Sequence, residues 1–158
     1  MTADQSKFMQ RAAELALQKM RVNSGGPFGA VIVRQGKVVA EGWNRVTSAN
    51  DPTAHAEIVA IRNACASLKT FSLEGCEIYT NCEPCPMCLG AIYWARLQCL
   101  YYANSRQDAA RIGFDDEFIY GEIALPPDGR SIPAVRIASE SADLAFREWV
   151  NSPDKIRY

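Results

Sequence analysis

Hydrophobic residues recur at intervals of three and four positions near the start of the chain, from Asp4 to Val22. Phe8, Ala12 and Leu15 share one face with neighbouring apolar residues. This period predicts an amphipathic helix that packs its apolar stripe against a flat surface. The run Asn23-Ser24-Gly25-Gly26-Pro27 is rich in helix breakers and is expected to end the helix.

The pattern then changes to short apolar runs rich in β-branched residues. Two of them are joined by Gln35-Gly36, which predicts a β-hairpin. The predicted strands are residues 28–34, 37–42, 77–80 and 98–103, with a last strand or extended arm at 132–138. The later predicted helices start near Thr53 and at Pro86 and span 105–113 and 141–149, with an acidic loop at 113–117. This alternation indicates an α/β domain with helices on the sheet faces.

Composition is typical of a soluble globular domain, with 158 residues, 48% hydrophobic and 22% charged. No apolar run of about 18 residues is present, so no membrane span is expected. The amino terminus lacks the apolar core of a signal peptide. Together with six cysteines interpreted as reduced thiols, these features predict a cytoplasmic protein.

Charge bears on the kind of partner. The 17 basic and 18 acidic residues give a formal net charge of -1. Nucleic-acid binding usually needs a basic face, which this balance does not indicate. The expected substrate is therefore a small free molecule, with no nucleic acid and no membrane as partner.

Two short motifs carry candidate chemistry, His55-Ala56-Glu57 and Pro84-Cys85-Pro86-Met87-Cys88. One imidazole and two thiolates fill three of the four tetrahedral positions of zinc and leave the fourth for water, as in catalytic zinc sites. Glu57 can then carry protons between that water, a ring nitrogen and a leaving amine. The combination of H-x-E with P-C-x-x-C is the general signature of zinc nucleobase deaminases.

Helix ends are expected to hold these residues. Pro86 suits the first position of a helix, which puts Cys85 at the cap and Cys88 in the first turn. Three residues of helix rotate by about 300°, so the two sulfurs lie within about 60° of each other. Asp51 or Thr53 is expected to cap the helix whose first turn carries the His and Glu. Two positive helix ends would then favour ionised thiols at one point.

The other cysteines are not expected to bind metal. Cys82 extends the spacing to C-x-x-C-x-x-C, but a fourth protein ligand would close the position that catalysis needs. Cys65, Cys76 and Cys99 lie in apolar segments without metal spacing and are expected to be small core residues.

Four segments together resemble bacterial guanine deaminases of the cytidine deaminase superfamily. They are Gly25–Val33, Asn50–Glu57, Cys82–Arg96 and Gly113–Asp116. The likeness runs from the first helix to Tyr158, and the last segment with that terminal aromatic residue points to the guanine branch. The resemblance implies a cytidine deaminase-like three-layer α/β/α sandwich around a five-stranded mixed sheet, one zinc ion per subunit, and a homodimer.

The resemblance also changes the expectation for the carboxyl end. On composition alone, residues 151–158 are polar, contain Pro153 and are typical of a frayed end. The resemblance implies a single domain over residues 1–158 whose C-terminal segment, about 130–158, crosses to the partner subunit and closes its pocket.

Roles follow from the same resemblance, position by position. His55, Cys85 and Cys88 would bind zinc, and Glu57 would shuttle protons. Asn44 and the Ala56 N–H would hydrogen-bond a purine, and Asp116 would accept from the ring N–H groups of that purine. Phe28 would stack on the purine and Trp94 would wall the pocket. Tyr158 would arrive from the other chain.

The implied reaction is hydrolytic deamination of guanine to xanthine and ammonia, by attack of zinc-bound hydroxide at C2. The residues themselves leave alternatives open, because deaminases of guanosine, cytosine or tRNA adenosine would share the same zinc motif. A non-catalytic structural zinc module is a further alternative. The open coordination position beside Glu57 argues against that alternative.

Overall fold

The computed structural model describes residues 2–157, which form two compact units, one up to Tyr120 and one from Gly121 onward. The elements are α1 (Ala3–Arg21), β1 (Gly29–Arg34), β2 (Lys37–Trp43), α2 (Val46–Ala49), α3 (Ala56–Leu68), β3 (Cys76–Cys82), α4 (Pro86–Trp94), β4 (Cys99–Asn104), α5 (Arg106–Arg111), α6 (Asp116–Ala124), η1 (Pro127–Gly129) and α7 (Glu140–Asn151). The α/β alternation predicted from sequence is confirmed.

The sheet is mixed, with strand order β2-β1-β3-β4. β1 pairs antiparallel with β2 and β3, and β3 pairs parallel with β4. The predicted hairpin is confirmed, and Gln35 and Gly36 take positive φ angles of 51° and 72°, as a type I′ turn requires. The sheet has four strands among the described residues, so the expectation of five is corrected.

The stretch predicted as the last strand, residues 132–138, has no regular secondary structure. Pro133 cannot donate a ladder hydrogen bond. Ile132, Val135 and Ile137 are 80–85% exposed, so this stretch packs on no neighbour within the described chain. Of the two alternatives predicted for this stretch, a strand is therefore wrong and an arm outside the sheet is correct.

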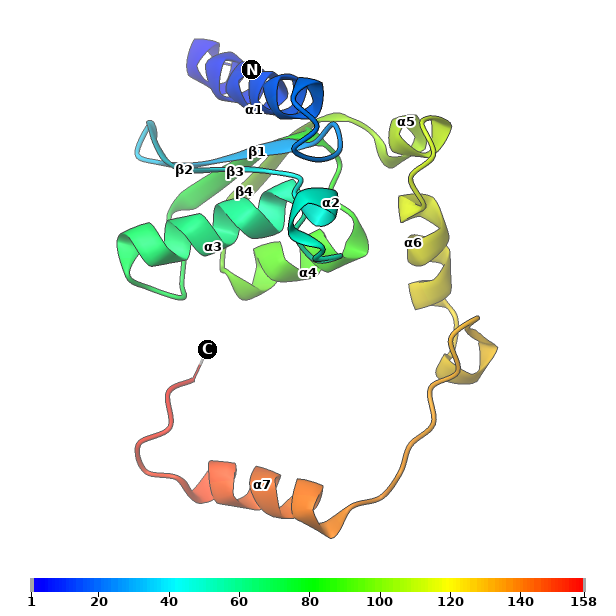
Figure 1. The fold of residues 1–158 in the computed structure, drawn as a ribbon. Helices are drawn as coiled ribbons and strands as arrows, with labels where there is room; N and C mark the ends of the chain where they lie inside the picture. Colours follow the sequence, from blue (N-terminus) through cyan, green and yellow to red (C-terminus); the bar gives the residue numbers. More distant parts are fainter. Residues whose placement is uncertain (1, 158) are drawn as a thin grey trace. The chain divides into compact units, whose positions relative to one another are not determined.

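Helices cover both faces of the sheet (Figure 1), with α1 on one face and α3 and α4 on the other. β1 is buried on both faces, so its side chains alternate between two cores. Val31 and Val33 pack with α1 and Tyr79, whereas Ala30 and Ile32 pack with α3 and the end of α4. The three-layer sandwich expected from sequence is thus confirmed.

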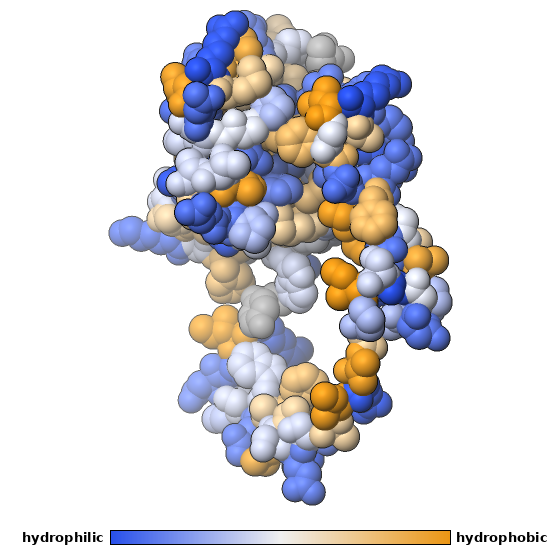
Figure 2. Space-filling model, turned by 45° about the vertical axis from the view of Figure 1, so that its right-hand side comes forward, coloured by the Kyte–Doolittle hydropathy of each residue, from blue (hydrophilic) through white to orange (hydrophobic). Residues whose placement is uncertain are grey.

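The C-terminal unit, from Gly121 on, has internal hydrogen bonds but little core. Arg130 donates to the carbonyl oxygens of Glu122 and Leu125, and Ser131 donates to the Glu122 carboxylate. α7 is amphipathic and confirms the helix predicted at 141–149. Its Phe146 is nevertheless 79% exposed. Figure 2 shows further apolar side chains, in orange, at the surface of this unit.

α6 begins at Asp116, where the sequence had been interpreted as an acidic loop. That prediction is wrong beyond Asp115, because carboxylates in a first turn favour the positive end of a helix. No helix within residues 2–157 combines the length and apolar character needed to cross a membrane.

Candidate active site

The helix α3 presents its amino end to the site. Its cap residue is His55, whose side chain makes no capping hydrogen bond. The expected cap by Asp51 or Thr53 is not formed, because the Asp51 carboxylate accepts the N–H and hydroxyl of Thr53 instead. The N–H of Ala56, at the first helical position, has no intrahelical partner and stays available.

The helix α4 starts as predicted. Cys85 is its cap residue, Pro86 is its first residue, and Cys88 lies in the same first turn. Both cysteines are buried, at 4% and 0% exposure. Proline suits this position because its missing N–H would have no helical partner there.

The two helix ends bring three candidate metal ligands together. His55 Nδ1 lies 3.6 Å from Cys85 Sγ and 3.5 Å from Cys88 Sγ, and all three ligand atoms lie within 4.8 Å of one another. Zinc bonds of about 2.0 Å to nitrogen and about 2.3 Å to sulfur, at a tetrahedral angle, separate the two atoms by about 3.5 Å. The spacing therefore suits zinc. Cys82 is not part of this cluster.

The two thiols differ in acidity. A hydrogen bond from the Cys88 thiol, together with His55, lowers the pKa of Cys85 to about 4 against the opposing effect of burial. The same hydrogen bond and burial raise the pKa of Cys88. Coordination to zinc deprotonates a thiol outright, so this pair is suited to hold the cation as two thiolates.

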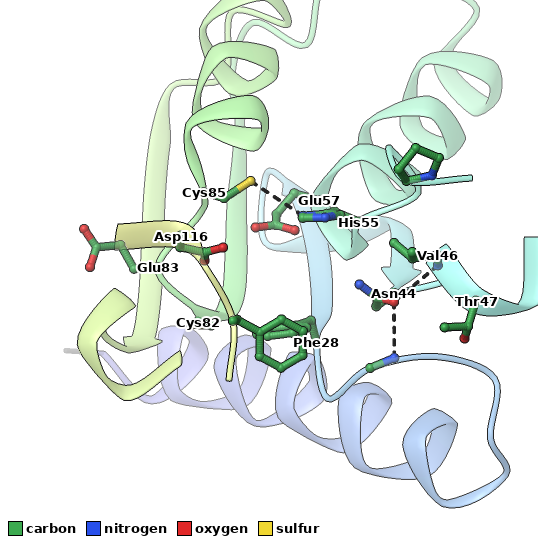
Figure 3. A pocket seen from close by; sticks show the side chains of 13 residues that line it. Phe28, Asn44, Val46, Thr47, His55, Glu57, Cys82, Glu83, Cys85 and Asp116 are labelled. Atoms are coloured by element: carbon green, nitrogen blue, oxygen red, sulfur yellow. Dashed lines mark hydrogen bonds between the residues drawn. The ribbon is translucent and has the colours of Figure 1, made fainter. Parts of the chain in front are cut away.

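Glu57 lies beside the cluster and is buried, at 7% exposure. Burial, together with the Cys85 thiolate, raises the pKa of its carboxyl group to about 7, and His55 opposes this rise. Figure 3 shows Glu57 next to His55 and facing Cys85. A carboxyl group with a pKa near neutrality can both accept and return a proton.

Asn44 has a fixed orientation. Its Oδ1 accepts from the N–H of Gly26 at 3.2 Å and from the N–H of Val46 at 3.3 Å, as the dashed lines in Figure 3 show. Its carbonyl oxygen is therefore engaged, and its NH₂ group is the part it can offer to a ligand. A Cβ at Gly25 would lie 1.8 Å from the backbone carbonyl oxygen of Asn44, so this loop requires glycine.

Opposite Asn44, Asp116 at the start of α6 points into the site, whereas Glu83 points away (Figure 3). Glu83 accepts instead from the N–H of Arg106. Burial raises the pKa of Asp116, and the Cys85 thiolate adds to the rise. Phe28 forms part of the wall and meets Phe114 edge to face, with ring centroids 4.6 Å apart.

These groups line one cavity of about 350 Å³. Its lining includes His55, Cys85, Glu57, Asn44, Phe28 and Asp116, all singled out from sequence. It also includes residues that sequence reasoning did not assign to the site, namely Val46, Thr47, Pro52, Cys82, Glu83 and Phe114. Phe114 could have been found from its position two residues before Asp116.

Among the described residues, one expected site residue is not brought to this cavity. Trp94 ends α4, is 65% exposed and is absent from the lining. Tyr158 lies outside the described residues. Of the cysteines expected in the core, Cys76 is buried, and Cys65 and Cys99 are half-buried.

The chain is similar in sequence and fold to several known proteins. The family described as the cytidine and deoxycytidylate deaminase zinc-binding region matches residues 2–104. Guanine deaminase from Bacillus subtilis strain 168 is 51% identical over 151 residues, 96% of this chain and 97% of that protein. An X-ray structure of guanine deaminase from Bacillus subtilis has a TM-score of 0.94 at 49% identity, covering 100% of this chain and 99% of that one. A tRNA-specific adenosine deaminase from Aquifex aeolicus strain VF5 is 44% identical over 92 residues, 58% of each protein.

Proposed function

The chain belongs to the family of zinc-binding cytidine and deoxycytidylate deaminases, and we propose that it hydrolyses guanine to xanthine and ammonia. The observation that carries this proposal is the single cavity that joins the His55, Cys85 and Cys88 cluster to Asn44 and Asp116. The guanine deaminase relative spans nearly the whole chain, whereas the tRNA adenosine deaminase spans little more than half.

The cavity favours a small neutral substrate. Among the described residues, its lining holds the carboxyl groups of Glu57 and Asp116 and no lysine or arginine, and the carboxyl group of Glu83 points away from it. A phosphorylated nucleotide or an RNA backbone would meet like charge there, which costs binding free energy. A free purine base carries no such charge, which supports guanine over nucleotides and tRNA.

His55, Cys85 and Cys88 would hold the zinc ion. When bound, zinc acts as a Lewis acid that activates a water molecule for attack at C2 of guanine. Glu57 would take the proton of that water and deliver protons to the ring nitrogen and then to the leaving amine. Its buried position and a pKa of about 7 support this double role.

The remaining groups would orient the base. The Asn44 NH₂ group donates, and guanine offers O6 and N7 as acceptors. The N–H of Ala56 is a second donor at the metal side. Asp116 accepts from ring N–H groups, which disfavours bases that lack them. Phe28 would stack on the base, and Phe114 packs against the Phe28 ring in a T-shaped arrangement.

A panel of substrates tests the reaction. We expect the zinc-loaded protein to release ammonia from guanine at least about tenfold faster than from guanosine, cytosine or an adenosine-containing RNA stem-loop. Faster release of ammonia from the RNA would indicate a tRNA-specific adenosine deaminase instead. Failure on all four substrates, with zinc bound, would favour a structural zinc module.

We also propose that the protein is a homodimer with a single domain per chain. About residues 130–158 of each chain would close the pocket of the partner subunit and bring Tyr158 to that pocket. The support is the C-terminal unit itself, since exposed Ile132, Val135, Ile137 and Phe146 need a surface to cover them. Trp94, which does not line the cavity of its own chain, would wall this pocket across the dimer interface. The six unpaired cysteines support a cytoplasmic location for the enzyme.

Subunit complementation tests the exchange. One chain carries Glu57→Gln with an intact C-terminus, and the other ends before Lys155 with an intact Glu57. Each alone should be nearly inactive. Mixing them after unfolding and refolding should restore activity, because one hybrid site then has both parts. Mixtures as inactive as their components, with dimers present by light scattering, would exclude the exchange.

A further inference from the structure

A tyrosine outside the cavity connects α6 to the loop that carries the metal ligands. The hydroxyl group of Tyr120 donates to the carbonyl oxygen of Pro84 at 3.0 Å, although the residues are 36 positions apart. Pro84 is fully buried and directly precedes Cys85. This hydrogen bond therefore ends on the most constrained part of the site.

The ring of Tyr120 is itself held in place. The Arg106 guanidinium lies 4.7 Å from the ring centroid, a cation–π arrangement. The backbone N–H of Arg106 donates to the Glu83 carboxylate at 3.0 Å. Glu83 and Pro84 are adjacent, so the start of α5 and the side chain of Tyr120 each form a hydrogen bond to the same loop.

Tyr120 lies one helical turn after Asp116. Residues four positions apart on a helix share a face, so both side chains project toward the metal loop. Asp116 lines the cavity, whereas Tyr120 does not. α6 has no buried residue, so packing does little to fix its position. The hydrogen bond to Pro84 then becomes an important restraint on where α6 begins.

We propose that Tyr120 is a positioning residue that holds the Asp116 carboxylate at its working distance from the metal ligands. The proposal rests on the substrate-binding role proposed above for Asp116. It adds a residue that touches neither substrate nor metal and acts through the helix that both side chains share.

The variant Tyr120→Phe tests this directly, because it keeps the ring beneath Arg106 and removes only the hydroxyl group. In the zinc-loaded, full-length enzyme we expect kcat/KM for guanine to fall about fivefold, the size expected for one neutral hydrogen bond. Zinc content should not change. Tyr93→Phe is the matched control, since Tyr93 is 72% exposed on α4, and its kcat/KM should stay within twofold.

A double-mutant cycle separates positioning from general stabilisation. If Tyr120 acts through Asp116, Tyr120→Phe should change kcat/KM less than twofold when Asp116→Asn is already present. An equal loss in both backgrounds would mean that Tyr120 supports the enzyme without acting through Asp116, and would overturn the proposal.

Amide hydrogen exchange provides a readout that needs no catalysis. Tyr120→Phe should accelerate exchange of the helical amides of residues 119–123 about fivefold and leave α3 unchanged. Unchanged exchange in α6 would refute the proposed restraint. If the wild-type protein does not deaminate guanine, the proposed function fails separately, and the exchange result alone still decides whether Tyr120 holds α6.

Discussion

The backbone of Gly42 on β2 runs so close to α3 that a Cβ at this position would lie 2.2 Å from the carbonyl oxygen of Ala56. The same Cβ would lie 2.4 Å from the N atom of Ala60. Both obstacles are backbone atoms of the helix that starts at His55, so neither can rotate away. The glycine thus lets the amino end of α3 sit against the sheet, where its residues reach the cavity.

Gly42→Ala should therefore be strongly destabilising. We expect the free energy of unfolding to fall by about 3 kcal/mol, because the added methyl group forces the helix from the sheet. Urea denaturation measures the loss. Gly90→Ala is the control, since a Cβ there meets no atom within 4 Å and a helical Gly→Ala change contributes up to about 1 kcal/mol of stability. Similar destabilisation by both variants would contradict this explanation.

Glu57→Gln should abolish proton transfer and keep the structure. The amide is nearly the same size as the acid but cannot accept the water proton, so turnover should drop at least about a hundredfold. Metal analysis should still find one zinc per chain. The exposed Glu74→Gln serves as the control and should turn over normally. Near-normal turnover in the Glu57 variant would remove this residue from the mechanism.

Removing one of the two thiolate ligands should weaken zinc binding. We expect Cys88→Ser to lose most of its zinc on dialysis against a chelator that leaves the wild type loaded, because a hydroxyl group is a poor zinc ligand. The thermal midpoint should fall with it, since the metal links the starts of α3 and α4. Cys99→Ser should retain one zinc per chain, because Cys99 lies outside the cluster. Equal retention by both variants would argue against the proposed ligand set.

Two substitutions at Asn44 separate its structural and binding parts. Asn44→Ala leaves the N–H groups of Gly26 and Val46 without their acceptor, and should cost about 1–3 kcal/mol of stability. Asn44→Asp keeps an acceptor oxygen but removes the NH₂ donor, so it should lose less stability. Both should raise KM for guanine more than tenfold, and an unchanged KM in the Asp variant would mean that the amide donor does not bind the base.

Local patterns predicted most of the elements. The three- and four-residue period gave α1, the two-residue turn gave the hairpin, and Pro86 marked the start of α4. The fifth strand and the acidic loop were wrong for different reasons. A strand needs a neighbour, which no local pattern of residues 132–138 supplies. The run Asp115-Asp116-Glu117 has the charge of both a solvated turn and a helix start, so charge alone does not distinguish them.

The candidate site likewise has features that the sequence indicated and features that it did not. Ligand chemistry and the spacing of Cys85 and Cys88 within one helical turn indicated a zinc-binding pair without any coordinates. The orientation of Asn44 did not follow from sequence, because it depends on N–H groups 18 positions away at Gly26 and two away at Val46. Phe114 was missed as a cavity residue because aromatic residues pack in cores far more often than they line sites.

By itself, the sequence determined which groups can bind zinc and move protons, because those properties belong to side-chain chemistry and to spacing within a few residues. Tertiary structure alone decided that His55 Nδ1 comes within 3.6 Å of a sulfur 30 positions away, and that one cavity joins this cluster to Asn44 and Asp116. Such distances depend on how α3 and α4 pack against one sheet and on contacts, such as that of Tyr120 with Pro84, that place the start of α6. Both are properties of the whole domain.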